Sequence, residues 1–590
     1  MTVSKPAKRR PLSARLAMRL RGLRTAAGHG LAAVRRLALA ERRRRARVAQ
    51  TRDELLARLR VLSAAAPVRR PQGRVLVDGL WDNPNYWLRY GLLRSALGLA
   101  ADEEIGLTGF FRTAEVTHSF ALLGISDTVS FAERLRRVKS EARASAQRLL
   151  RDTRGPDDVM AWRLPDDFPN DIVYDGLLKR QRGACVDVHH PEIEAHVTEA
   201  LACVQAADQL IGEIAPRRIV LSHAVNFACG ALAWAALRRG IPTVVLFGNY
   251  GLPRFFKLQT AADLHDWNDG LAKEEIVSLT EARAAALERI GAEYVKRRLA
   301  GATDDLGARS AFVTASKFID RKGLANAFGW TGNRPVVTVY ASNWFDFPHA
   351  CGLTNFRDFL DWLRVTVDRA VAIEDVYWLF KPHPCDEWYG GVTLADLMPA
   401  HGASHIALAA PEWNGADVFA ASDALVTTHS TGGVEFAASG KPVLLADRGW
   451  YDRAGLAVVA SSREHYAELL GEAWWTRIDR ETAARRARIF AGAYFCAPDW
   501  PSILITDDDS RQDALYEPLL AMLRSLDGWE RECDTLRRWA ESPTSRYHLF
   551  KMLEADGYAL SNVLGRRETH ANGLPALGGD VPALEGSTGS

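Results

Sequence analysis

The sequence predicts an α/β fold made of two consecutive Rossmann-like domains. Short apolar runs with strand character alternate with longer stretches of helical periodicity, and this alternation occurs twice along the chain. An almost entirely helical stretch at residues 271–327 separates the two series. Because strands that alternate with helices of this length form parallel sheets covered by helices, each series predicts one domain. The length of 590 residues, 47% of them hydrophobic, supplies more than one core.

The first series begins after a break at residues 67–73, where Pro and Gly interrupt the pattern. A buried strand opens it, and the Asn-Pro-Asn turn at residues 83–85 starts the helix that follows. Gly240 ends the last helix before the final strand. The expected strands lie at residues 74–78, 104–110, 219–222 and 242–247, and the expected helices at 86–97, 131–155, 192–214 and 228–239.

The second series has the same alternation. Its expected strands lie at residues 335–340, 376–380, 405–408, 424–427 and 442–446, and its expected helices at 354–373, 414–421 and 432–439. We place the first domain with its bridging helices at residues 67–327 and the second domain at 328–461. Residues 462–560 have a helical pattern, and the Gly-, Ser- and Pro-rich end predicts a disordered tail at 561–590.

Positive charge is concentrated at the N-terminus. Residues 1–50 contain 15 of the 75 Lys and Arg residues and one acidic residue, Glu41, although the net charge of the chain is only +3. Apolar and basic positions at near-helical spacing suit a helix on an anionic membrane. A solvated, partly disordered extension has the same composition, as does a segment that binds nucleic-acid phosphates. We treat residues 1–66 as a basic arm, helical or partly disordered, and favour a membrane surface over nucleic acid as its partner.

The cysteine and hydropathy patterns indicate a cytoplasmic protein. The seven cysteines are widely spaced and include no C-x-x-C pair, so they predict neither a disulfide framework nor a structural zinc site. No apolar run has the length of a membrane span, and the arginine-rich N-terminus does not resemble a secretory signal. The basic arm is the one route that the sequence offers to the inner face of the cytoplasmic membrane.

Two segments that follow predicted strands indicate a phosphate-binding site. The first is Lys381-Pro-His383-Pro, in which the prolines stiffen the loop and leave a lysine and an imidazole at a strand end. Ligands of open α/β sheets bind at the carboxyl ends of strands, where Lys381 supplies a charge and His383 a donor for a phosphate oxygen. The alternative is that His383 is only a turn residue.

The second segment, Thr428-His-Ser-Thr-Gly-Gly433, follows a predicted strand and opens a helix. Its hydroxyls and glycines favour close backbone approach and direct free N–H groups at an anion, and Glu435 is placed to accept hydrogen bonds from ribose hydroxyls. The alternative is an ordinary helix N-cap. The residues assigned to a donor or phosphate site are Lys381, His383, Ser430, Thr431, Gly432, Gly433 and Glu435.

These segments, with the run through Gly440-Lys-Pro-Val443 and Asp447-Arg-Gly-Trp-Tyr451, resemble the capsule polysaccharide synthesis family. That family comprises bacterial glycosyltransferases of GT-B architecture, including Kdo-transferring capsule enzymes. The resemblance covers residues 335–460 and extends to the N-terminal half only as general topology. It implies two Rossmann-like domains facing a cleft, with His383, Ser430 and Thr431 binding the phosphates of a nucleotide-activated sugar, often a CMP-sugar, without a metal or other cofactor.

A GT-B enzyme is expected to hold its acceptor and general base on the facing first domain. A carboxylate or imidazole must take the proton of the acceptor hydroxyl, and Asp82 and His223, each near a predicted strand end, are our candidates. A capping or hydrogen-bonded structural role is the alternative for both. Acceptor or sugar contacts are assigned to Asn85, Asn249, Arg254, Asn343 and Trp344, the last by stacking on a sugar or base.

The sequence therefore predicts a glycosyltransferase of capsule or related surface-polysaccharide synthesis, which moves a sugar from a nucleotide-activated donor to a growing glycan or glycolipid. The Gly-Gly-x-Glu run also resembles CDP-glycerol-type polyol-phosphate transferases and UDP-sugar 2-epimerases. A non-catalytic scaffold, held to a membrane or to nucleic acid by the basic arm, is the alternative from another class.

Overall fold

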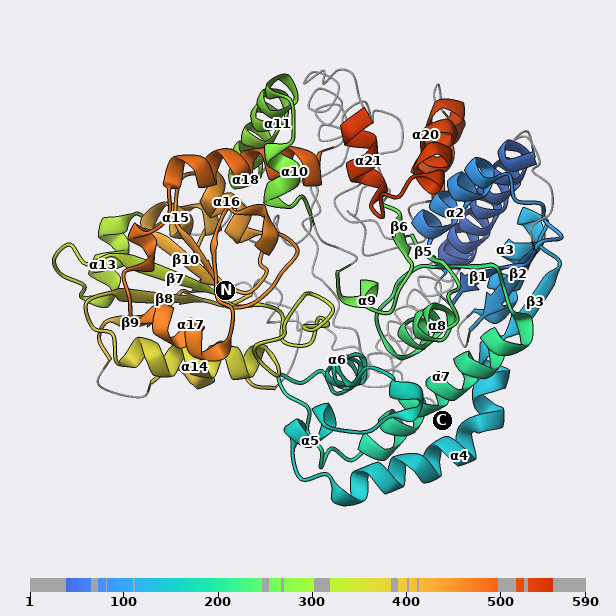
Figure 1. Cartoon of the computed structure of the whole chain (residues 1–590), viewed down its shortest axis with the longest axis horizontal. Coiled ribbons are helices and arrows are strands. Elements are labelled where there is room, and N and C mark those ends of the chain that lie inside the picture. Colours follow the sequence, from blue (N-terminus) through green and yellow to red (C-terminus); the bar gives the residue numbers. More distant parts are fainter. Residues whose placement is uncertain are drawn as a thin grey trace, which may run out of the picture.

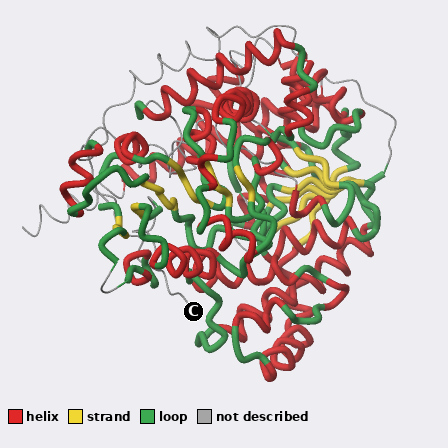
Figure 2. Tube along the Cα trace, turned by 60° about the vertical axis from the view of Figure 1, so that its left-hand side comes forward, coloured by secondary structure: helices red, strands yellow, loops and turns green. Residues whose placement is uncertain are grey.

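The computed structural model describes residues 39–64, 73–80, 82–109, 112–246, 254–266, 270–301, 319–383, 391–399, 403–410, 413–496, 516–524 and 529–554. The strands form two separate six-stranded sheets, one in each half of the molecule (Figure 1). Helices lie on both sides of the strands, as the red and yellow segments of Figure 2 show. The prediction of an α/β chain with two sheet-based domains is confirmed.

The first sheet has the strand order β3-β2-β1-β4-β5-β6. Its first five strands are parallel and β6 is antiparallel to β5. All five residues of the central strand β1 are buried, as expected for a parallel strand covered on both faces. The strands are β1 (Val75–Gly79), β2 (Glu104–Thr108), β3 (Asp127–Ser130), β4 (Arg218–Leu221), β5 (Thr243–Val245) and β6 (Phe256–Leu258).

The helices of the first domain bury their apolar faces against this sheet and against one another. In α4, buried side chains recur every three or four residues from Phe131 to Ala146, and the Ser130 side chain caps the helix by accepting a hydrogen bond from the Glu133 amide. The helices are α2 (Pro84–Leu97), α3 (Thr113–Leu123), α4 (Phe131–Asp152), α5 (Pro156–Met160), α6 (Asn170–Gln181), α7 (Ile193–Ile214), α8 (Phe227–Leu237) and α9 (Asp263–Asp266), with a 3₁₀ turn at Pro165–Asp167.

The second sheet repeats the topology of the first. Its order is β12-β11-β10-β7-β8-β9, and all of its strand pairs are parallel. Counted from the first strand of each domain, both sheets follow the order 3-2-1-4-5-6 of the Rossmann fold. The strands are β7 (Val336–Tyr340), β8 (Tyr377–Lys381), β9 (Ile406–Leu408), β10 (Ala424–Thr427), β11 (Val443–Leu445) and β12 (Val458–Val459).

The remaining helices link and cover the domains. Those between the sheets are α10 (Lys273–Val277), α11 (Glu281–Leu299) and α13 (Arg321–Phe328). Those of the second domain are α14 (Phe359–Val371), α15 (Gly415–Ala421), α16 (Gly432–Ala438) and α17 (Arg463–Leu470), with 3₁₀ turns at Leu394–Leu397, Asp452–Ala454 and Trp474–Thr476. The C-terminal helices are α18 (Arg480–Phe495), α19 (Tyr516–Arg524), α20 (Trp529–Glu541) and α21 (Tyr547–Glu554).

The C-terminal helices pack against both halves of the molecule. Helix α18 lies against α11 and α16, whereas α20 lies against α2 of the first domain (Figure 1). Lys257 of β6 donates to the Trp539 carbonyl oxygen at the end of α20 over 2.8 Å. These helices therefore belong to the packing of both domains.

The N-terminal arm, expected to span residues 1–66, is in part a packed helix. Residues 39–64 are helical, and the side chains of Leu55, Leu56 and Leu59 are fully buried in a cluster with α2, α3, α19 and α20. Residues 42–47 of the same helix are exposed and include Arg42, Arg43, Arg44, Arg45 and Arg47. The second half of this helix is therefore part of the first domain.

Residues 1–38 and the predicted tail at 561–590 lie outside the described residues. Within the described part of the chain, no helix is both long and apolar enough to cross a membrane.

The crossing of α11 and α18 gives a test of the packing. An added Cβ at Gly291 would lie 1.8 Å from the carbonyl oxygen of Arg488. We expect Gly291→Ala to lower the free energy of unfolding by about 1–3 kcal/mol, because the two helices must separate. Denaturant unfolding followed by circular dichroism measures this loss. Gly212→Ala in α7 is the matched control, because the nearest atom to its added Cβ is Nη2 of Arg239 at 3.5 Å. Equal stability of the two variants would contradict a tight crossing.

Candidate functional site

The second sheet reverses its strand order between β7 and β10, and the two predicted motifs lie at this point. Open α/β sheets bind ligands outside the carboxyl ends of the strands at such a switch point. The hydroxyls of Ser342, after β7, and Thr428, after β10, lie 3.0 Å apart and join the two strand ends. Lys381, the last residue of β8, is paired with Tyr340 of β7. The carboxyl ends of β7, β8 and β10 therefore meet at one edge.

The turn into α16 satisfies its own backbone donors. The Gly432 amide donates to Oγ of Ser430 over 3.2 Å, and the Gly433 amide donates to the Ser430 carbonyl oxygen over 2.9 Å. Oη of Tyr451 donates to that same carbonyl over 2.7 Å. The expectation that free N–H groups of Gly432 and Gly433 point at an anion is therefore wrong. A ligand at this turn meets the side chains of Ser430 and Thr431, which are partly exposed.

The two glycines of the motif are required by aromatic packing. A Cβ at Gly432 would lie 2.7 Å from the Tyr340 ring, and a Cβ at Gly433 would lie 2.1 Å from the Tyr451 hydroxyl. Both positions are fully inside the protein. The close approach that these glycines permit is to neighbouring tyrosines.

Glu435 has a partner inside the protein in place of the expected ribose hydroxyls. Its carboxylate forms an ion pair with Nε of Arg298 from α11, and the two side chains are 6% and 4% exposed. Nη2 of Arg298 also donates to Oγ1 of Thr431 over 3.1 Å. Breaking a buried pair of this kind strands a charge away from water, so Arg298 and Glu435 hold the start of α16 in place. Sequence pattern alone does not indicate a role for Arg298, because its partners lie over 130 residues away.

Lys381 and His383 lie where the sequence places them. Burial lowers the pKa of the Lys381 ammonium group below its usual value, so this charge is poorly solvated without an anionic partner. His383 is partly exposed and is near enough to His429 that its charge lowers the pKa of that residue. The ends of β8 and β10 thus bring two imidazoles near each other, and Lys381 lies two residues before one of them.

His429 is a site residue that the sequence analysis did not select, although it lies within the second motif. Burial lowers the pKa of its imidazole to about 4, while Asp346 acts to raise it and His383 to lower it further. Its Nδ1 lies 3.1 Å from the Thr428 hydroxyl, and its ring packs 5.2 Å from that of Phe359. At neutral pH this imidazole is uncharged and serves as a hydrogen-bonding group.

The segment after β7 carries further candidates. Oδ1 of Asn343 is buried without a hydrogen-bond partner among the described residues, so it retains an unused acceptor beside Ser342. Trp344 is 4% exposed and packs in the main core, so its predicted stacking on a sugar or base is wrong. Asp346 is exposed and forms an ion pair over 3.0 Å with Nζ of Lys179 from α6.

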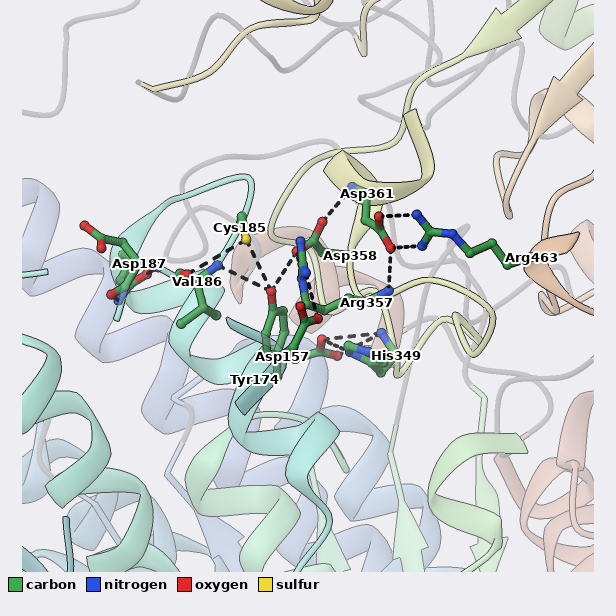
Figure 3. Close-up of polar contacts among 12 residues, drawn as sticks. Asp157, Tyr174, Cys185, Val186, Asp187, His349, Arg357, Asp358, Asp361 and Arg463 are labelled. Atoms are coloured by element: carbon green, nitrogen blue, oxygen red, sulfur yellow. Dashed lines mark hydrogen bonds and ion pairs between the residues drawn. The ribbon is translucent and has the colours of Figure 1, made fainter. Parts of the chain in front are cut away.

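Helix α6 connects the carboxyl-end loops of both sheets. On one side, Tyr174 donates to Asp358 over 2.7 Å, as drawn in Figure 3. The buried carboxylate of Asp175 accepts from Nδ1 of His349 over 2.6 Å. On the other side, Gly176 packs so closely on Phe227, which begins α8 after β4, that an added Cβ would lie 2.1 Å from its ring. The two carboxyl edges therefore lie on opposite sides of one helix.

A salt bridge at the start of α5 extends this contact. Arg357 bonds Asp157 over 2.7 Å and Asp358 over 3.1 Å (Figure 3). Burial alone would lower the pKa of His349, but the charge and hydrogen bond of Asp175 outweigh it and raise that pKa. The contact is therefore a network of charge-assisted hydrogen bonds between the domains.

The first sheet reverses its order between β1 and β4 and has a polar cluster at the same point. Asp78 of β1 and Ser222 after β4 form a hydrogen bond of 2.6 Å between Oδ2 and Oγ. Nδ1 of His223 lies 3.0 Å from the Ser222 Oγ. Burial lowers the pKa of His223, while the charge of Asp78 acts to raise it. His223, predicted as a general base, is thus a partly exposed imidazole at the switch point.

The other first-domain candidates have structural partners or cannot be placed. Asp82 accepts from Nε1 of Trp87 over 3.0 Å and lies 3.6 Å from Nη1 of Arg112. Arg254 is fully buried, with its guanidinium 3.9 Å from the Tyr494 ring centroid, so its predicted acceptor contact is wrong. Asn249 lies outside the described residues, as does the side chain of Asn85 in the first turn of α2.

Among the residues that the structure describes, no three His, Cys, Asp or Glu side chains are grouped to hold a metal ion.

No protein-family model matches the chain, and no curated protein matches it. Among solved structures, it is similar to UDP-GlcNAc 2-epimerase from Neisseria meningitidis bound to UDP-GlcNAc, at 10% identity over 76% of this chain and 100% of the epimerase, with a TM-score of 0.22. It is also similar to the glycosyltransferase SnogD from Streptomyces nogalater, at 13% identity over 77% and 100%, with a TM-score of 0.21. UGT89C1 from Arabidopsis thaliana, complexed with UDP-L-rhamnose, gives 11% identity over 77% and 100%, with a TM-score of 0.23. Likenesses at this level support no statement about activity.

The burial of His429 gives a pH-dependent contribution to stability. Its pKa is about 4 in the folded protein against an ordinary value of 6.5, so the unfolded chain binds more protons between these two values. The contribution of neutral His429 is therefore fully present above pH 6.5 and is lost as the pH falls toward 4. We expect His429→Gln to show a smaller loss of unfolding free energy between pH 7 and pH 5 than the unsubstituted protein. Urea titrations at both pH values measure the difference, and identical losses would contradict a buried neutral imidazole.

Proposed function

We propose that the protein is a glycosyltransferase of GT-B type that binds a nucleotide-activated sugar at the carboxyl ends of β7, β8 and β10. The observation that supports this most directly is the pair of Rossmann-like sheets whose switch points lie on opposite sides of α6, each with its own imidazole. A transfer reaction needs two substrates bound next to each other. Each switch point supplies a binding edge for one of them.

Charged groups and hydroxyls support a donor site at this edge. Lys381 and His383 are the cationic and donor groups for the diphosphate or monophosphate of the nucleotide. Ser430 and Thr431 offer hydroxyls on the neighbouring strand end, and Asn343 offers an amide. Burial deprives the Lys381 ammonium group of the stabilising interaction with water. A phosphate that pairs with Lys381 replaces this interaction, which favours an anionic ligand at this edge. The resemblance of the motifs to capsule enzymes favours a CMP-sugar.

His223 supports an acceptor site at the edge of the first sheet. A general base for a sugar hydroxyl needs a lone pair at neutral pH, and the lowered pKa of His223 keeps the imidazole uncharged there. Asp82 is the second candidate, but its carboxylate is engaged by Trp87 and Arg112. We therefore assign the proton transfer to His223, with a growing surface glycan or glycolipid as the acceptor.

A cytoplasmic location at the inner face of the membrane fits this acceptor. The exposed arginines at residues 42–47 form a basic surface at the start of the helix that docks on the first domain. Anionic headgroups attract such a surface by about 1 kcal/mol per Lys or Arg near the membrane. We propose that this helix and the preceding residues bring the acceptor side to a lipid-linked glycan.

Nucleotide binding tests the donor site. Calorimetric titration with CMP and with UDP should show binding of one of them, weakened at least tenfold in His383→Ala and in Ser430→Ala, because each change removes a hydrogen bond to phosphate. His465→Ala is the matched control, because this partly exposed histidine of α17 bonds only the nearby Ser461 and Ser462 in the part of the chain described. No binding of either nucleotide, or equal binding by all the variants, would overturn the site.

Turnover distinguishes the reaction classes. The transferase should release nucleotide only when a glycan acceptor is present, and His223→Ala should lower kcat by about a hundredfold or more, which is typical of losing a general base. A UDP-sugar 2-epimerase would convert its nucleotide-sugar without any acceptor, and a polyol-phosphate transferase would require CDP-glycerol. Mass spectrometry and NMR of the products separate these outcomes.

Deletion of residues 1–38, together with replacement of Arg42, Arg43, Arg44, Arg45 and Arg47 by alanine, tests the scaffold alternative. A transferase should retain its nucleotide binding, because the packed leucines of residues 55–59 remain in place. A scaffold would lose its main interaction with anionic vesicles or nucleic acid and would show no nucleotide binding before or after deletion.

A further inference from the structure

The serine between Asp78 and His223 defines how protons are shared at the first switch point. Asp78 is 1% exposed, and both of its oxygens accept hydrogen bonds from backbone amides. Oδ1 accepts from the Leu80 amide over 2.6 Å, and Oδ2 accepts from the Ser222 amide over 2.9 Å. Both oxygens therefore act as acceptors in this cluster. The Ser222 hydroxyl, 2.6 Å from Oδ2, is the donor in that contact.

The remaining contact then determines the tautomer of His223. A serine hydroxyl has a single hydrogen, and Asp78 takes it. Toward Nδ1 of His223, 3.0 Å away, the Ser222 oxygen can only accept. Nδ1 must carry a hydrogen, so in the neutral imidazole the lone pair lies on Nε2. Two buried residues thus decide which nitrogen of His223 can take a proton.

Burial and the neighbouring Arg89 favour the neutral form of the His223 imidazole. Arg89 of α2 acts to lower the pKa of His223. Burial raises the pKa of both Tyr86 of α2 and Cys229 of α8 well above their usual values, so both stay protonated. Cys229 lies 4.0 Å from Oδ2 of Asp78. Asp78 is therefore the carboxylate that faces His223 in this cluster.

We infer that Asp78 and Ser222 are positioning residues that hold His223 as its Nδ1–H tautomer, with Nε2 as the proton acceptor for the hydroxyl of the sugar acceptor. This assignment rests on the proposed transferase function. In the step, the acceptor O–H proton moves to Nε2, and the acceptor oxygen bonds the anomeric carbon of the donor sugar. The bond from that carbon to the nucleotide phosphate oxygen breaks, and the phosphate leaves with the electron pair. The imidazolium then returns its proton to water.

Nitrogen NMR of the protein labelled with ¹⁵N-histidine reads the tautomer without any substrate. Loss of signals in His223→Gln assigns this residue among the 15 histidines. At neutral pH we expect Nδ1 of His223 to have the shift of a protonated nitrogen and Nε2 that of an unprotonated one. Ser222→Ala should reverse or average these shifts, and Ser222→Thr, which keeps the hydroxyl, should preserve them. An Nε2–H tautomer in the unsubstituted protein would overturn the inference.

Kinetics separates positioning from general damage. We expect Ser222→Ala to lower kcat about ten- to a hundredfold with little change in KM and to alter the acidic limb of the pH–rate profile, with recovery in Ser222→Thr. Ser95→Ala is the matched control, because it also removes a buried serine hydroxyl, one that bonds Ser63. Equal activity of Ser222→Ala and Ser95→Ala would overturn the inference while leaving the transferase intact. Absence of turnover with every donor would instead overturn the proposed function, and the NMR tautomer would still decide the hydrogen-bond assignment.

Discussion

The buried carboxylate of Asp175 sets the placement of the two sheets. It lies on α6 of the first domain, and its partners belong to the second domain: the imidazole and amide of His349 and the amide of Ala350. A carboxylate that is buried without such donors is strongly destabilising, so the segment after β7 must follow α6. Because the same segment contains Asn343 and Asp346 at the edge of the second sheet, this contact also places the candidate donor site relative to the first domain.

The two switch points use one structural device for different chemistry. In each sheet, a hydroxyl after one strand bonds a polar side chain at the carboxyl end of the neighbouring strand: Ser342 with Thr428, and Ser222 with Asp78. The second sheet surrounds this bond with Lys381, His383 and His429, which suits an anionic ligand. The first sheet surrounds it with a carboxylate and His223, which suits proton transfer. A shared backbone topology thus carries two edges with opposite electrostatic character.

The glycine-rich motif has a larger structural role than its composition indicates. Gly432 and Gly433 make room for Tyr340 and Tyr451, and Glu435 neutralises Arg298 in the interior. Substitution of these residues would disturb the start of α16 before it affected a ligand. The side chain of His383 is a better probe of binding, because it is partly exposed and lies outside α16, whereas the hydroxyls of Ser430 and Thr431 also bond the Gly432 amide and Arg298 at the start of that helix.

Local pattern was sufficient for the elements that bury one face or a continuous apolar run. Strand β10, the end of β7, the start of α16 and the order of two α/β domains followed from the sequence by itself, as did the placement of Lys381, His383 and Ser430 at strand ends. The edge strand β3, Asp127–Ser130, was missed because it is polar and partly exposed. Helix α6 was missed because seven consecutive residues from Ile172 to Leu178 are buried, which removes the helical period. Only the tertiary structure could reveal the partners of Arg298, Asp175 and His223, because hydrogen bonds and ion pairs between distant segments depend on how the sheets pack, and sequence spacing contains no record of that packing.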